Sequence, residues 1–190
     1  DYSQIELRVL AHMSQDKGLI AAFNRDEDIH TATASQVFDV PIKEVTSDQR
    51  RFAKVVNFGL VYGMGEFGLA VRTERSREEA APIIEEYFAK YPGILGYLEE
   101  TKNNARAHGY VQTMMGRRRH LPEVRAANFQ VRSAAERMAV NMPIQGTAAD
   151  IVKVAMIRLE KRMQGMELRG RMILQVHDEL LFETPVEELE

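Results

Sequence analysis

The chain has 190 residues, of which 45% are hydrophobic and 28% charged, and this composition suits one globular unit with a sizeable core. No apolar run approaches the ~20 residues that span a bilayer and no signal-peptide pattern is present, so we expect a cytoplasmic protein without a membrane partner. The absence of cysteine excludes disulfides and thiolate metal sites, and the formal charge of -3 does not by itself indicate nucleic-acid binding.

Capping signals predict that the first half of the chain is mainly helical. Ser3 and Glu6 form a capping-box pattern, so Asp1 lies just before a helix. Ser76 and Glu79 repeat the pattern and open another helix, which Pro82 should bend. Further helices are expected over 28–37, over 48–62, and from 94 to 108 with Gly109 as the stop.

The second half is predicted to mix helices with short strands. A strand is expected over 110–115, followed by a basic turn at Arg117-Arg118-Arg119-His120. A helix over 131–141 should end at Pro143. Thr147 and Asp150 should then cap a separate helix that runs to about residue 164.

Two apolar runs near the end of the sequence predict a β-hairpin. They cover 171–176 and 180–183, and the short polar segment His177-Asp178-Glu179 separates them. Asp178 therefore lies at the tip of a hydrophobic hairpin. We find no internal repeat, low-complexity tract or linker.

One predicted helix carries cations and aromatic rings in an order that suits a nucleoside triphosphate. Arg50, Lys54, Phe58 and Tyr62 are each four residues apart, so they share one ridge about 18 Å long. The cations can hold phosphate oxygens, and the rings offer flat apolar surface to a base. A helix with a charged face and packing aromatics would look similar. The glycines at 59, 63, 65 and 68 favour the ligand-binding interpretation, since they suit close backbone approach or a hinge.

Other polar residues support weaker interpretations. Asp1 and Asp178 could together bridge two hard divalent cations, although each is also an ordinary residue for its position. Arg137, Asn141 and Gln145 could donate hydrogen bonds to acceptors in a minor groove, but helix capping and a solvated face explain them equally simply. The arginines at 117–119 fit a solvated turn better than a phosphate clamp.

Taken together, these segments resemble the motifs of the family A DNA polymerases, the bacterial DNA polymerase I type. The first eight residues, Asp-Tyr-Ser-Gln-Ile-Glu-Leu-Arg, resemble motif A. Residues 50–63 resemble motif B, with its Arg, Lys, Phe and Tyr-Gly positions intact, and residues 175–179 resemble motif C. A fourth similar stretch covers 136–150, so the resemblance extends over essentially the whole chain.

The resemblance implies an α+β fold, in which a mostly helical fingers subdomain is inserted in an incomplete antiparallel palm of a right-hand polymerase. The expected boundaries are 1–27 for the palm part with motif A, 28–125 for the fingers, and 126–190 for the palm part with motif C. The chain would then be a fragment of a longer, monomeric polymerase, with exposed apolar surface and little activity alone.

The implied activity is template-dependent addition of dNTPs to a primer 3′-hydroxyl, with two Mg²⁺ ions. Asp1 and Asp178, with the Tyr2 carbonyl, would hold the metals, and Lys54 would join the two aspartates as a catalytic residue. The implied dNTP contacts are Arg50, Lys54, Phe58, Tyr62, His30, Gln4 and Glu6, the last as a steric gate against a ribose 2′-hydroxyl. The implied primer-template contacts are Arg137, Asn141, Gln145 and His177.

Two other functions use the same residues. A two-metal nuclease or another phosphoryl transferase would need the carboxylate pair but not the ridge on 50–62. A nucleotide-binding or nucleic-acid-binding module would use the ridge without catalysis. Metal-dependent turnover separates the enzymes from the binding module.

Overall fold

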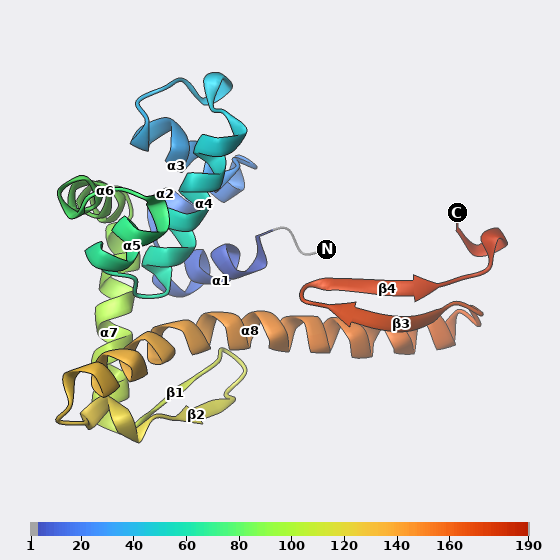
Figure 1. Ribbon diagram of the computed structural model, residues 1–190. Coiled ribbons are helices and arrows are strands. Elements are labelled where there is room, and N and C mark those ends of the chain that lie inside the picture. Colours follow the sequence, from blue (N-terminus) through green and yellow to red (C-terminus); the bar gives the residue numbers. More distant parts are fainter. Residues whose placement is uncertain (1–3, 190) are drawn as a thin grey trace.

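The computed structural model describes residues 4–189, which form eight α-helices and two small antiparallel sheets (Figure 1). The α-helices are α1 (Ile5–Ser14), α2 (Lys17–Asn24), α3 (Ile29–Val37), α4 (Ser47–Val61), α5 (Glu66–Thr73), α6 (Arg77–Lys90), α7 (Pro92–His108) and α8 (Phe129–Gly165). The strands are β1 (Tyr110–Gln112), β2 (Arg118–His120), β3 (Arg171–Val176) and β4 (Glu179–Glu183), and the short 3₁₀ helices are η1 (Ile42–Glu44), η2 (Pro122–Arg125) and η3 (Val186–Glu188). Within this part of the chain, no helix combines the length and the apolar character that crossing a bilayer requires.

Local capping signals locate several helix ends as predicted. Ser76 and Glu79 form a reciprocal capping box at the start of α6. Gly109 ends α7 in the left-handed conformation, with φ of 76°. The start of α1 differs from the prediction because Gln4 is its N-cap, while Ser3 lies outside the described residues. The short helices α2 and α5 were not predicted.

The largest difference from the sequence-based prediction is that α8 is one helix of 37 residues with Pro143 inside it. Pro143 is buried, so packing at this position compensates for the backbone hydrogen bond that proline removes. Thr147 and Asp150 do not cap a second helix. Thr147 Oγ1 accepts a hydrogen bond from the Met114 amide at 3.0 Å, and the buried Asp150 carboxylate accepts from Thr113 Oγ1 at 2.8 Å.

The basic cluster is also placed differently from the prediction. The first strand stops at Gln112, and residues Arg118–His120 form β2, which pairs antiparallel with β1. The turn between the strands contains Gly116, whose φ is 82°. Arg117 forms an ion pair with Asp150, so this β1–β2 hairpin is fastened to α8 (Figure 1).

Helix α8 connects the two apolar clusters of the structure. In the larger cluster, Leu10 of α1, Val56 of α4, Ile94 of α7 and Ile144 of α8 are fully buried. Each such side chain contributes about 1.5–3 kcal/mol when it leaves water. A smaller cluster lies where β1 and η2 pack against the first half of α8, and its members are Ala105, Val111, Leu121, Val124, Ala135 and Ala139.

The β3–β4 hairpin confirms the predicted element at the end of the sequence. Its strands pair antiparallel, and its turn lies at a cleft together with residues of α8. It carries the exposed apolar surface that the sequence led us to expect. Ile173 and Leu174 are 55% and 51% exposed, and Phe182 is 39% exposed.

Asp16 joins the start of α2 to the start of α7. Its carboxylate is buried, and it accepts hydrogen bonds from the amides of Leu19 at 2.9 Å and Gly93 at 2.8 Å. A Cβ atom on Gly93 would lie 2.9 Å from the Cα of Asp16, which is too close for an ordinary contact. A Cβ atom on Gly96, in the same helix, would meet no atom within 4 Å.

We therefore expect opposite effects from two glycine substitutions in α7. Gly93→Ala should lower the free energy of unfolding by about 1–3 kcal/mol, because the new methyl group pushes α7 from Asp16. Gly96→Ala should raise it by about 0.5–1 kcal/mol through helix propensity. Urea denaturation of both variants measures the difference, and equal effects would contradict the close approach at Gly93.

Candidate functional site

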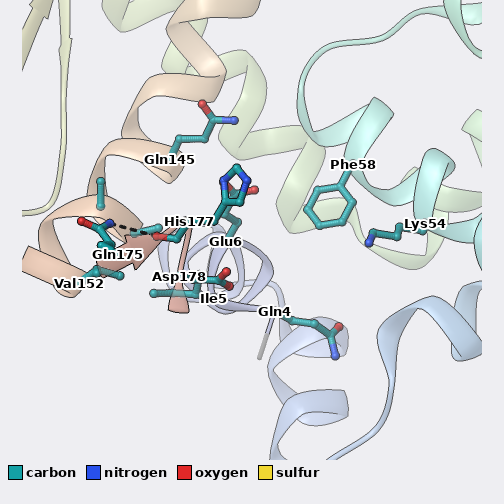
Figure 2. Close-up of a pocket in the computed structure, with 12 residues that line it drawn as sticks. Gln4, Ile5, Glu6, Lys54, Phe58, Gln145, Val152, Gln175, His177 and Asp178 are labelled. Atoms are coloured by element: carbon teal, nitrogen blue, oxygen red, sulfur yellow. Dashed lines mark hydrogen bonds between the residues drawn. The ribbon is translucent and has the colours of Figure 1, made fainter. Parts of the chain in front are cut away.

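A cleft of about 500 Å³ brings together residues from four separate parts of the chain (Figure 2). The candidates that line it are Gln4, Glu6, Lys54, Phe58, Gln145, His177 and Asp178. They come from the start of α1, from α4, from α8 and from the turn between β3 and β4. Figure 2 shows Lys54 and Phe58 on one side of the cleft and Asp178 on the other.

The turn of the β3–β4 hairpin places a carboxylate on this cleft. His177 has a φ of 52°, a left-handed conformation that lets the chain reverse within two residues and puts Asp178 at the tip. Gln175 Nε2 supports the turn by donating to the His177 carbonyl at 3.1 Å. Among residues 4–189, no group forms an ion pair or hydrogen bond with the Asp178 carboxylate, which is therefore available to a ligand.

The chemistry of Asp178 fits a divalent cation. A carboxylate that is half-buried and unpaired is the type of oxygen donor that Mg²⁺ prefers. The other two candidate metal ligands, Asp1 and Tyr2, lie outside the described residues. Residues 4–189 alone contain no cluster of three or more metal-ligating side chains.

A hydrogen bond between Tyr62 and Glu6 connects the end of α4 to the start of α1. The Tyr62 hydroxyl donates to the Glu6 carboxylate. Burial raises the pKa of Tyr62, and the hydrogen bond to Glu6 raises it further, so the phenol stays neutral. Glu6 is thereby held in the first cleft, which Phe58 also lines.

The predicted ridge on α4 is present and separates two clefts. Lys54 and Phe58 line the first cleft and also a second one of about 730 Å³, to which Tyr62 and Arg137 contribute. The rings of Phe58 and Tyr62 lie 6.0 Å apart between their centroids. Arg50 lines neither cleft.

Arg50 and His30 are both held by the N-terminus of α3. Asp28 caps α3 through the His30 amide at 3.0 Å, and the same carboxylate accepts a hydrogen bond from Arg50 Nε at 2.6 Å. Burial opposes ionisation of Asp28, but the hydrogen bonds from Arg50 and Thr31 outweigh it and lower its pKa. Burial lowers the pKa of His30 to about 4, so its ring is neutral at neutral pH.

The candidate primer-template residues are distributed along α8 and the hairpin. Gln145 and His177 line the first cleft, whereas Arg137 lines the second and donates to Ser133 Oγ at 3.0 Å. Asn141 lines neither, but its Oδ1 is buried and has no hydrogen-bond partner within residues 4–189. An unpaired buried acceptor costs about 1–3 kcal/mol, so a ligand that donates to it would gain that energy.

The second cleft contains residues that the sequence did not single out. Arg51, Phe67 and Arg72 line it together with the ridge. Arg72 belongs to α5, which had no recognisable start signal because its N-cap is Gly65 without a side-chain hydrogen bond. Met64 also lines it, and Cβ atoms on Gly59 or Gly68 would lie 2.7 Å from its side chain, which explains two of the four glycines.

The whole chain matches the profile of DNA polymerase family A, over residues 1–190. This chain belongs to DNA polymerase family A. It is 55% identical over 190 residues to DNA polymerase I of Bacillus caldotenax, covering 100% of this chain and 22% of the relative. It is 54% identical over 183 residues to DNA polymerase I of Pseudomonas aeruginosa, covering 96% of this chain and 20% of the relative. The chain thus spans about a fifth of the length of these family A relatives.

A solved structure shares the fold of this family A chain. It is the POL domain of Pol1 from M. smegmatis, in complex with DNA primer-template and dNTP. The TM-score is 0.96 at 52% sequence identity, and the match covers 99% of this chain and 33% of the other. The predicted family is therefore confirmed, as is a mainly helical fold with small antiparallel sheets.

The pKa of His30 predicts a specific loss of stability in acid. Between its folded pKa of about 4 and its ordinary value of 6.5, the unfolded chain binds a proton that the folded chain does not. The stability that the neutral His30 ring contributes to the folded state is therefore complete above pH 6.5 and is lost as the pH falls toward 4. Urea denaturation should show that the wild type loses up to about 3 kcal/mol more than His30→Gln over this range. Parallel losses in both proteins would contradict the neutral, buried ring.

Proposed function

We propose that this chain carries the nucleotide-addition site of a DNA-directed DNA polymerase, which adds dNTPs to the 3′-hydroxyl of a primer opposite a template. The observation that carries this proposal is the first cleft, where Lys54 and Phe58 of the α4 ridge face Asp178 of the hairpin turn (Figure 2). A nuclease would have no use for a cation-aromatic ridge beside the carboxylate. Membership of family A and the likeness to a polymerase domain support the same function.

In this proposal Asp178, with Asp1 and the Tyr2 carbonyl, would hold two Mg²⁺ ions. Mg²⁺ supplies charge neutralisation for the triphosphate and acidifies the attacking 3′-hydroxyl when it is bound. The Asp178 carboxylate has no hydrogen-bond or ion-pair partner within residues 4–189, which supports this assignment.

The α4 ridge would bind the incoming nucleotide along its length. Lys54 is exposed and lies across the cleft from Asp178, so its ammonium can hold the phosphates of a nucleotide bound between them and can contact the leaving pyrophosphate. Arg50 would bind phosphate oxygens from its place beside Asp28. Phe58 and Tyr62 would pack against the sugar and base, and Gln4 and Glu6 would line the sugar side, with Glu6 excluding a 2′-hydroxyl.

Arg137, Asn141, Gln145 and His177 would contact the primer-template, which we propose as the second partner. Gln145 and His177 line the first cleft and Arg137 lines the second, and Asn141 lies between Arg137 and Gln145 on α8. We assign residues 28–125 to a fingers subdomain and residues 1–27 and 126–190 to parts of a palm. The parent protein would be a cytoplasmic monomer that acts on DNA.

Primer extension tests the proposal most directly. Because the chain spans about a fifth of its relatives, residues 1–190 replace the corresponding segment of a complete family A polymerase. We expect templated extension with Mg²⁺ and four dNTPs. Asp178→Ala should slow it by about a thousandfold or more, because a metal-holding carboxylate contributes several kcal/mol to the transition state.

Glu183→Ala is the matched control, since Glu183 is an exposed carboxylate on the same hairpin. It should retain the activity of the unmodified graft. A folded graft that binds dNTP and DNA without extension would contradict the polymerase function and favour a binding module. If the Asp178→Ala graft were as active as the unmodified graft, the hairpin carboxylate would have no part in the reaction.

A further inference from the structure

A buried hydrogen-bonded chain connects α3 to α4 behind the nucleotide ridge. Thr33 Oγ1 donates to Asn57 Oδ1 at 3.1 Å, and Asn57 Nδ2 lies 3.0 Å from His30 Nδ1. Asn57 is fully buried, and Thr33 and His30 are each 3% exposed. The two helices pack closely against each other along this contact (Figure 1).

The chain of donors determines which nitrogen of His30 carries the proton. Because the Thr33 hydroxyl donates to the amide oxygen of Asn57, the amide nitrogen faces the imidazole. An amide nitrogen can only donate, so Nδ1 of His30 must accept. A neutral imidazole has one donor and one acceptor, and the proton therefore lies on Nε2.

His30 is one of the dNTP contacts that the family resemblance implies. We propose that Asn57 is a positioning residue for it, which holds His30 as its neutral, Nε2-protonated tautomer and so determines that Nε2 is the atom that donates to a triphosphate oxygen. This inference rests on the proposed polymerase function. Nε2 of His30 is bonded to no other group within residues 4–189, so this donor is available.

The charges around His30 show why a fixed tautomer matters. Asp28 on its own helix favours protonation of the ring, whereas Arg50 and Lys54 on α4 oppose it, and burial opposes it most strongly. The ring is thus neutral, and only its tautomer decides what it presents to a phosphate. The other tautomer would direct a lone pair at an anionic oxygen, which would repel the ligand.

Asn57 is the neighbour of a ridge residue in the sequence, so its contact with His30 links the Nε2 donor to the α4 ridge. Asn57 directly precedes Phe58, whose ring centroid lies 5.5 Å from that of His30. Helix α4 therefore presents the ridge residues on one face and aligns His30 from its buried face. Arg50 and Lys54 would supply charge, and His30 would supply a directional hydrogen bond that is independent of pH above about 6.

The first test measures the tautomer directly. Histidine ring ¹⁵N signals are recorded by multiple-bond NMR in the active graft at neutral pH, with His30→Gln used for assignment. The inference requires a protonated Nε2 and an unprotonated Nδ1. In Asn57→Asp the carboxylate can only accept, so the proton should move to Nδ1 and the pKa of His30 should rise.

The second test measures KM for dTTP against pH. In the unmodified graft the effect of His30 on KM should not change between pH 6 and 9. In Asn57→Asp the KM relative to the unmodified graft should rise with pH, because only the imidazolium keeps the Nε2 donor. A merely structural role for Asn57 would change KM or kcat by the same factor at every pH, and that result would overturn the inference.

A matched pair at His30 keeps the inference testable if Asn57→Asp does not fold. The amide nitrogen of Gln can replace Nε2, whereas that of Asn lies nearer the position of Nδ1. His30→Asn should raise KM for dTTP about tenfold or more, which is the size expected for a lost hydrogen bond to a charged group. His30→Gln should have a KM much closer to that of the unmodified graft. Equal KM values for the two variants would contradict a donor at Nε2.

The outcomes separate this inference from the proposed function. An inactive, folded graft overturns the polymerase function and with it the role of His30. An active graft whose His30 carries its proton on Nδ1 overturns the inference about Asn57 alone.

Discussion

The continuity of α8 through Pro143 is the constraint on which the arrangement of the site depends. One rigid helix of 37 residues packs against α1, α7 and β1 and also borders the first cleft. Because Arg137, Asn141 and Gln145 all lie in α8, their separations are set by helix geometry and not by a loop. A break at Pro143 would separate Gln145 from the part of α8 that carries Arg137 and Asn141.

The ridge on α4 is fixed at both ends and open in the middle. The Tyr62–Glu6 hydrogen bond fastens its C-terminal end to α1, and the Arg50–Asp28 ion pair fastens its start to α3. Lys54, between these contacts, is exposed to both clefts. The arrangement holds both ends of the ridge in place and leaves the long, flexible side chain of Lys54 exposed between the two contacts.

Elements with local signals could be predicted from the sequence, and elements that depend on distant contacts could not. The capping box at Ser76 and the glycine stop at Gly109 act within one helical turn, and both were predicted. Thr147 and Asp150 have the same local pattern as a cap, but their side chains bond to the β1–β2 hairpin, 33 and 37 positions away. For the same reason the arginine run is not a solvated turn: Arg118 and Arg119 lie in β2, and Arg117 forms an ion pair with Asp150.

The candidate site shows the same division. The spacing of Arg50, Lys54, Phe58 and Tyr62 specified the ridge, since it depends only on helix periodicity. Asn57 had no signal, because its partner His30 lies 27 positions away and only the packing of α3 on α4 reveals the contact. Resemblance to family A selected the site residues beyond the ridge, and the cleft brings five of them together with Lys54 and Phe58 of the ridge.

The central claim is that the α4 ridge and the hairpin carboxylate serve one nucleotide. Photo-crosslinking with a dNTP that carries an azide on its base, in the grafted polymerase with primer-template, tests it most directly. The account predicts a base label on Phe58 or Tyr62, located by mass spectrometry of the digested protein. A label confined to the β1–β2 hairpin would place the base elsewhere and contradict the account.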